Sequence, residues 1–278
     1  MEKGEIDING KDLNKIHNND CVQFMKENIG DCSIDLTVTS PPYDDLRNYN
    51  GYSFNFEETA QELYRVTKDG GVVVWVVGDK THKGSETGTS FRQALFFKEI
   101  GFNLHDTMIY RKDNPLPQNH NRYEQEFEYM FVFSKGKPKV FNPRKEPCRT
   151  AGTKYDYSNR GGAASIKENN PAVRRKSKCT VTKDDKTKGN IWGYLVGMHK
   201  STSDKIAFDH PAIFPEKLAE DHILSWSNEG DIVFDPFIGS GTTAKMAALN
   251  NRKYIGTEIS KEYCDIANER LRNYIGAK

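Results

Sequence analysis

Apolar, strand-like runs alternate with helical segments along most of the 278-residue chain. This alternation limits the possible folds most, because strands alternating with helices of this length form βαβ units and a mostly parallel sheet. Seven strands are expected, at residues 15–19, 34–38, 72–77, 104–110, 127–133, 231–234 and 253–257. Six helices are expected among them, at residues 21–29, 56–68, 89–100, 215–226, 242–250 and 260–273. The sequence therefore predicts an α/β fold in which helices cover both faces of a seven-stranded sheet.

The segment 142–190 interrupts this pattern. It is rich in Lys, Arg, Ser, Thr, Asn and Gly and shows no sustained period of either a strand or a helix. Residues 144–188 contain 13 Lys and Arg against 5 Asp and Glu, a net charge of +8, although the whole chain carries only +1. Such a local excess of positive charge is typical of nucleic-acid contact, since phosphates supply most of the affinity. The alternative is a solvated, disordered loop.

A glycine turn follows the expected strand 231–234. Gly239, Gly241 and Ala244 satisfy G-x-G-x-x-G/A, and Glu258 ends the next strand, where a carboxylate can accept hydrogen bonds from ribose hydroxyls. The missing Cβ atoms let the backbone turn tightly and approach a ligand closely. This pattern predicts a ribose-bearing cofactor at the carboxyl ends of the strands, and a nicotinamide-dependent oxidoreductase is one interpretation of it.

A second unusual stretch, TSPPYDDL at residues 39–46, follows the expected strand 34–38. Pro41 and Pro42 have no N–H for a sheet ladder and fix φ near −65°, so the chain must leave the sheet in a stiff, extended form. Ser40 precedes the two prolines and Tyr43 follows them. The nicotinamide interpretation leaves this arrangement unexplained.

Together, DPFIGSGTT at residues 235–243 and SPPY at residues 40–43 resemble the signatures of the amino-directed DNA methyltransferases. In that family, a catalytic loop placed before the recognition region, with the cofactor loop last, marks the β group. The resemblance implies a Rossmann-like methyltransferase sheet, S-adenosyl-L-methionine as cofactor and double-stranded DNA as partner. It divides the chain into a catalytic half (1–141), a target-recognition insertion (142–200) and a cofactor-binding half (201–278).

The SPPY tetrapeptide is then the expected catalytic loop. An exocyclic amino group is a poor nucleophile, and the Ser40 side-chain oxygen and the Pro41 carbonyl can accept its two N–H bonds. Preorganised dipoles of this kind need no rearrangement during the reaction. Pro42 helps to fix the direction of that carbonyl, and Tyr43 is expected to stack on a base flipped out of the duplex. Serine at the first position favours cytosine N4 in the resembling family, and adenine N6 is the alternative.

Further site residues are expected on either side of these loops. The cofactor-binding residues are expected to be Asp20, Phe214, Asp235, Pro236, Phe237, Gly239, Gly241, Thr242 and Glu258. Asp20 can also simply cap the helix that follows it. The DNA-binding residues are expected to be Arg144, Arg149, Arg160, Arg174, Arg175 and Lys176.

Other protein classes receive less support from the sequence. The five cysteines are scattered and never spaced as CxxC, so we expect neither a disulfide framework nor a metal site. No apolar run reaches the length of a membrane span, and the protein is expected in the cytoplasm of a bacterium or archaeon, or to be phage-encoded. An RNA methyltransferase and a catalytically silent DNA-binding protein are further alternatives. The family resemblance leaves open whether a cognate restriction endonuclease accompanies the enzyme or whether it acts alone. It offers a homodimer as a candidate assembly, because relatives of the β group often dimerise.

Overall fold

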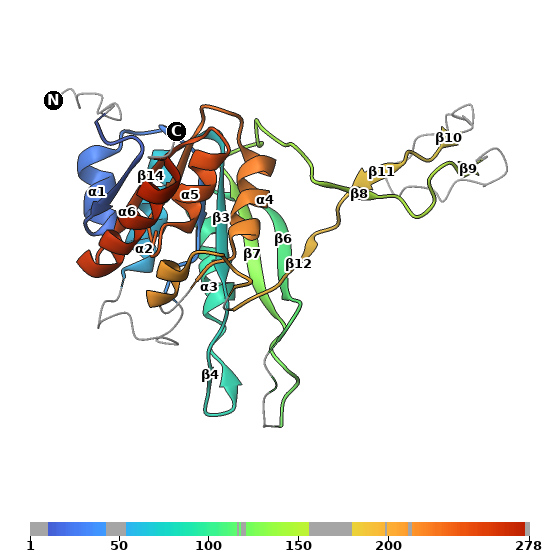
Figure 1. Cartoon of the computed structure of the whole chain (residues 1–278), viewed down its shortest axis with the longest axis horizontal. Helices are drawn as coiled ribbons and strands as arrows, with labels where there is room; N and C mark the ends of the chain where they lie inside the picture. Colours follow the sequence, from blue (N-terminus) through green and yellow to red (C-terminus); the bar gives the residue numbers. More distant parts are fainter. Residues whose placement is uncertain are drawn as a thin grey trace. The chain divides into compact units, whose positions relative to one another are not determined.

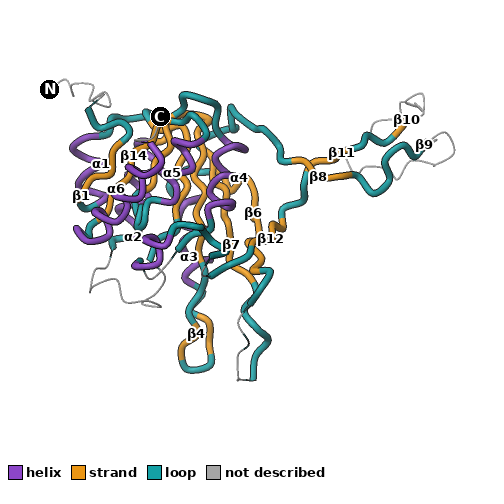
Figure 2. The backbone as a smooth tube through the Cα atoms, viewed as in Figure 1, coloured by secondary structure: helices purple, strands orange, loops and turns teal. Residues whose placement is uncertain are grey.

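The computed structural model describes residues 11–42, 54–115, 117, 121–155, 180–197, 199–210 and 213–275. The chain forms two compact units. Met1–Asn142 and Asn190–Lys278 make up the first, and Pro143–Gly189 makes up the second. The helices and the large sheet belong to the first unit (Figures 1 and 2).

The first unit is built on one mixed sheet of eight strands. Their order is β1 (Lys15–Asn18), β14 (Lys253–Glu258), β13 (Ile232–Asp235), β2 (Ile34–Thr39), β3 (Thr67–Val77), β7 (Phe127–Ser134), β6 (Asn103–Lys112) and β12 (Ile191–Tyr194). β7 runs antiparallel to β3 and to β6, whereas the other neighbouring strands pair in parallel. The carboxyl ends of β1, β14, β13, β2 and β3 therefore meet at one edge of the sheet, where ligands bind in folds of this type.

The predicted count of seven strands was wrong by one. All seven expected strands form, and β12 adds an eighth that pairs with β6 from Ile191↔Ile109 to Tyr194↔Lys112. Its sequence, IWGY, has only four residues and includes a glycine, so it carries no recognisable strand period. β12 forms a strand because it pairs with the free edge of β6. This pairing depends on the fold and cannot be predicted from the local sequence. Residues 190–200 accordingly belong with the sheet, although the sequence-based division put them in the insertion.

Helices pack on both faces of the sheet, as predicted. The described helices are α1 (Cys21–Asn28), α2 (Phe56–Val66), α3 (Thr89–Glu99), α4 (Glu216–Trp226), α5 (Thr242–Leu249), α6 (Lys261–Ile275) and the short 3₁₀ helix η1 (Lys205–Asp209). Asp20 caps α1 by accepting hydrogen bonds from two backbone N–H groups, and Asn55 caps α2 by accepting one from Glu58. These caps satisfy backbone donors that the first helical turn leaves open.

The core has two parts because the central strands are buried on both faces. On β3, Val72, Val74 and Val76 pack into the cluster that includes residues of α4, α5 and α6. The intervening Val73, Trp75 and Val77 pack into the cluster that includes residues of α1, α2 and α3. This two-sided burial holds the carboxyl ends of the central strands in a rigid frame. A small hairpin, β4 (Thr81–His82) and β5 (Ser85–Glu86), extends beyond the end of β3 (Figure 1).

The second unit contains two short antiparallel pairs. They are β8 (Lys145–Pro147) with β11 (Asp185–Thr187) and β9 (Lys154–Tyr155) with β10 (Thr180–Val181). Among the arginines expected to bind DNA, Arg144 is half-buried and Arg149 is exposed. Arg160, Arg174, Arg175 and Lys176 lie outside the described residues.

Candidate functional site

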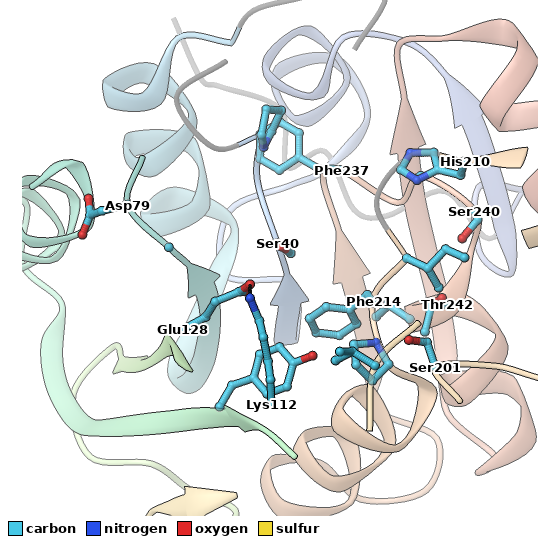
Figure 3. A pocket seen from close by; sticks show the side chains of 18 of the residues that line it. Ser40, Asp79, Lys112, Glu128, Ser201, His210, Phe214, Phe237, Ser240 and Thr242 are labelled. Atoms are coloured by element: carbon cyan, nitrogen blue, oxygen red, sulfur yellow. Dashed lines mark ion pairs between the residues drawn. The ribbon is translucent and has the colours of Figure 1, made fainter. Parts of the chain in front are cut away.

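A cavity of about 1640 Å³ opens at the carboxyl edge of the sheet. It brings together most of the residues that the sequence singled out. Those that line it are Asp20, Ser40, Pro42, Phe214, Asp235, Pro236, Phe237, Gly239, Thr242 and Glu258. Figure 3 shows Ser40 at the end of its strand, with Phe237, Phe214 and Thr242 around the same space. Pro41 and Gly241 do not line the cavity. Pro41 is buried next to Ser40, and Gly241 is the N-cap residue of α5. Tyr43 lies outside the described residues.

The turn between β13 and α5 requires its glycines. Gly239 and Gly241 have φ of 49° and 83°, in the left-handed region that favours glycine. A Cβ atom on Gly239 would lie 2.9 Å from Nε2 of His210, and one on Gly241 would lie 3.1 Å from Cβ of Ala267. The backbone of this turn therefore passes close to its neighbours, and Gly239 lines the cavity.

Glu258, at the end of β14, holds the turn from the opposite side. One carboxylate oxygen accepts a hydrogen bond from Gly239 N–H at 3.0 Å, and the other accepts one from Ser260 N–H at 2.9 Å. Burial raises the pKa of this carboxyl group. A carboxylate has about four lone-pair sites, so acceptor capacity remains for the hydroxyls of a ribose. Glu258 and the glycine turn therefore suit the ribose-bearing cofactor that the sequence predicts.

Asp235 is more deeply placed, with 5% of its surface exposed. Thr39 donates to its Oδ1 at 2.6 Å, and Phe237 N–H donates to the same atom at 3.0 Å. Burial raises the pKa of Asp235 to about 6, against the lowering effect of these hydrogen bonds. Asp235 thus joins the end of β2 to the start of the glycine turn. This side chain therefore fixes the predicted catalytic loop and the predicted cofactor loop to each other.

Aromatic rings form another part of the wall. The Phe237 ring meets the ring of Phe54 edge-on at 4.9 Å and that of Trp75 at 6.2 Å, and both Phe54 and Phe237 line the cavity. Asp20 also lines the cavity, while its Oδ1 accepts hydrogen bonds from Val22 N–H and Gln23 N–H, each at 2.9 Å. Capping and cavity lining therefore coexist at Asp20. Sequence reasoning missed Phe54, because only the fold brings it onto Phe237.

Another group of lining residues comes from β6 and β7. Lys112 and Glu128 form an ion pair of 2.7 Å and point toward each other near Ser40 (Figure 3). Tyr110, which is paired across the strands with Glu128, also lines the cavity, and burial raises its pKa. Sequence reasoning did not select these three residues. Strands were expected at residues 104–110 and 127–133, but the sequence does not indicate which side chains of this region face the pocket.

His210 lies beside the glycine turn. Its ring is 4.4 Å from that of Tyr263, and both residues line the cavity. Figure 3 shows His210 at this wall. Within the described part of the chain, no cluster of His, Cys, Asp or Glu is arranged to hold a metal ion. Among the same residues, no helix is both long and apolar enough to span a bilayer.

The comparisons with known proteins agree with this geometry. Residues 34–269 match a family model described as DNA methylase. The chain is 72% identical over 255 residues to the orphan methyltransferase M.BamHII of Bacillus amyloliquefaciens, covering 90% of this chain and 93% of that protein. It is 31% identical over 268 residues to the type II methyltransferase M.BglII of Bacillus subtilis, covering 93% and 69% of the two chains.

Solved structures give the same picture. The complex of M1.HpyAVI with S-adenosylmethionine aligns with 92% of this chain and 99% of that chain, with a TM-score of 0.55 and 25% identity. The cytosine-N4-specific PvuII DNA methyltransferase aligns with 92% and 85% of the two chains, with a TM-score of 0.64. At 21% identity, the second likeness bears on the fold alone.

Proposed function

Since this chain belongs to the DNA methylase family that modifies adenine N6 or cytosine N4, we propose that it methylates the exocyclic amino group of a flipped base, with cytosine N4 favoured. The cofactor is S-adenosylmethionine. One observation carries the proposal. Ser40, at the end of β2, and the turn around Gly239, at the end of β13, line the same cavity. A base and a methyl donor bound at these two loops would meet in one pocket.

The catalytic loop supplies acceptors for the amino group. Its nitrogen becomes a better nucleophile when both N–H bonds are held and the lone pair is freed from conjugation with the ring. The Ser40 side-chain oxygen and the Pro41 carbonyl take these two hydrogen bonds in the proposed complex. β2 lies between β13 and β3, so the acceptors are mounted on the buried centre of the sheet. Such preorganisation is a major source of electrostatic stabilisation in enzymes.

The cofactor half of the cavity positions the methyl donor. Glu258 accepts from the ribose hydroxyls, Phe237 contacts the adenine ring, and Asp20 lies at the same end. The bound sulfonium supplies an electrophilic methyl group. Holding nucleophile and methyl carbon in line accounts for much of the acceleration, because the orientational entropy is lost on binding. The amino nitrogen gains the methyl group and afterwards loses a proton to solvent, so no strong general base is needed. Tyr43 is proposed to stack on the flipped base.

The proposal that cytosine is the target base rests on Ser40. A neutral hydroxyl in the first position of the tetrapeptide favours cytosine N4 in the resembling family, with adenine N6 as the alternative. The test is to methylate DNA with the purified protein, digest it to nucleosides and weigh them. Detection of N4-methylcytosine supports the proposal. Detection of N6-methyladenine alone would show that the target base is adenine. Structured RNA that competes with duplex DNA for methyl transfer would instead support the RNA alternative.

The basic segment 144–188 is proposed to contact DNA. Arg149 is exposed in the second unit and offers a clean test, because losing one phosphate contact lowers the slope of log affinity against log salt by about 0.9. Arg149→Ala should show this decrease. Lys261→Ala is the matched control, since Lys261 is exposed on α6 and already paired with Asp265. Equal salt slopes in both variants would exclude Arg149 from the interface.

The partners are proposed in the same way. The relative with 72% identity is named an orphan methyltransferase, which favours an enzyme that acts without a cognate endonuclease. The homodimer stays a prediction, and light scattering of the purified protein across a concentration series tests it. A mass of one chain at every concentration would reject the dimer.

A further inference from the structure

A buried cluster of charged side chains lies behind the cofactor turn. It consists of Asp204, Glu216 at the start of α4, Lys245 on α5 and Arg270 on α6. Arg270 is fully buried, with no exposed surface. Asp204 and Glu216 each pair with both Lys245 and Arg270, so four separate segments of the first unit meet in this cluster.

Arg270 contacts the cofactor turn directly. One terminal nitrogen donates to the Ser240 carbonyl at 3.0 Å and to the Thr242 hydroxyl at 2.9 Å. Ser240 and Thr242 line the cavity. The planar guanidinium has a fixed fork of donors, so the direction of its other bonds determines where these two groups are held.

The remaining nitrogens of Arg270 fix that direction. Nε donates to Asp204 at 2.6 Å, and the second terminal nitrogen donates to the Thr202 hydroxyl at 3.1 Å and to Glu216. Glu216 follows Phe214 and Pro215, and its backbone N–H donates to the Ser201 carbonyl at 3.0 Å. Since Phe214 and Ser201 also line the cavity, Arg270 connects three of its wall segments.

The charges in the cluster balance. Lys245 donates to Asp204 and to Glu216, each at 2.7 Å, and its ammonium lies 3.8 Å from the centre of the Tyr274 ring. Two acids thus face two bases, with the Tyr274 hydroxyl as a further donor to Asp204. Buried ion pairs of this kind often contribute little net stability compared with apolar side chains of similar size. Stability alone is therefore a weak reason for placing four charges here.

We propose that Arg270 is a positioning residue for the cofactor site, acting through Ser240 and Thr242 to align the glycine turn with the start of α4. Arg270 itself does not line the cavity. The inference rests on the proposed function only in that the cofactor binds at this turn.

The test compares Arg270→Lys with Arg252→Lys. Arg252 is also buried and donates to the carbonyls of Ser227 and Asn250, each at 2.7 Å, but neither it nor these partners line the cavity. S-adenosylhomocysteine affinity is measured by calorimetry well below the melting temperature of each variant. We expect Arg270→Lys to weaken binding about tenfold, or about 1.4 kcal/mol, while Arg252→Lys lowers the melting temperature without changing affinity.

Enzyme kinetics provide the second readout. Arg270→Lys should raise the KM for S-adenosylmethionine and leave the KM for DNA unchanged, a split that a general loss of packing would not produce. Affinity equal to wild type in a folded Arg270→Lys protein overturns the inference, as does an equal loss of affinity in Arg252→Lys. If the wild type itself fails to bind S-adenosylhomocysteine, the proposed cofactor site is wrong instead.

A milder variant covers the case in which Arg270→Lys does not fold. Thr202→Val removes one hydroxyl that donates to Glu216 at 2.6 Å and accepts from Arg270 and from the Asp204 N–H, each at 3.1 Å, with little change in shape. Thr202 does not line the cavity. We expect about threefold weaker binding of S-adenosylhomocysteine, because the change reaches the cofactor turn only indirectly, through Arg270. Unchanged affinity in a folded Thr202→Val protein would overturn the inference.

Discussion

Replacing Gly239 by alanine perturbs the cofactor turn at its tightest point. An L-residue in the left-handed region costs about 1 to 2 kcal/mol. The added Cβ would also lie 2.9 Å from Nε2 of His210, and overpacking of this kind adds about 1 to 3 kcal/mol. We therefore expect Gly239→Ala to lower the free energy of unfolding by about 2 to 5 kcal/mol.

The matched control is Gly230→Ala. Gly230 has φ of 84°, and its added Cβ would meet nothing within 4 Å. It therefore carries the backbone penalty of about 1 to 2 kcal/mol without a clash, and it lies outside the cavity lining. The difference between the two variants isolates the contact with His210. A double-mutant cycle of Gly239→Ala with His210→Ala should show a coupling of that size.

Urea unfolding gives the stabilities, and calorimetry gives the affinity for S-adenosylhomocysteine. Because the Gly239 N–H is held by Glu258, a displaced turn should weaken binding about tenfold or more, whereas Gly230→Ala should bind as wild type does. A Gly239→Ala protein that matches Gly230→Ala in both stability and affinity would refute the reasoning.

Three further variants test the buried ionisable groups. Burial raises the pKa of Asp235 to about 6, so ionised Asp235 destabilises the fold, and wild-type stability should fall by up to about 3 kcal/mol as pH rises from about 4 to 6. Asp235→Asn should lack this fall in urea unfolding, and parallel pH profiles would contradict the assignment. Burial lowers the pKa of His222 to about 3, so stability should instead be lost as pH falls below about 6.5. His222→Leu should reduce this loss of stability at acid pH. If the urea midpoint of the variant falls between neutral and mildly acidic buffer by as much as that of the wild type, the assignment to His222 is contradicted. Glu258→Gln turns one acceptor into a donor facing a backbone N–H, so calorimetry should show S-adenosylhomocysteine binding weakened about tenfold or more, and wild-type affinity would exclude Glu258 from the cofactor site.

Much of the fold follows from local patterns. The seven expected strands and six expected helices form where local sequence places them. On β3, for example, an unbroken apolar run suits a strand that packs into a hydrophobic cluster on each face. The glycine turn was also predictable, since glycine readily adopts a positive φ such as the 49° of Gly239. Elements whose conformation depends mainly on local residues can therefore be predicted from the sequence.

The features that escaped prediction depend on residues distant in sequence. β12 is a strand only through its pairing with β6, and Phe54 reaches the site only through its contact with Phe237. The ion pair of Lys112 and Glu128 faces the cavity because two antiparallel strands place it there. Arg270 is the extreme case, since a surface-like charge pattern on α6 gives no indication of a fully buried guanidinium. Such positions require the assembled fold.

Nucleoside analysis of DNA from cells that express either the wild-type chain or Ser40→Ala tests the central claim most directly. The claim is that the end of β2 holds the amino group while the turn after β13 holds the methyl donor. We predict a methylated amino base in wild-type DNA and about a hundredfold slower methylation with Ser40→Ala, the usual loss for one preorganised hydrogen bond, while S-adenosylhomocysteine affinity is unchanged. Methylation at the wild-type rate by Ser40→Ala would contradict the account.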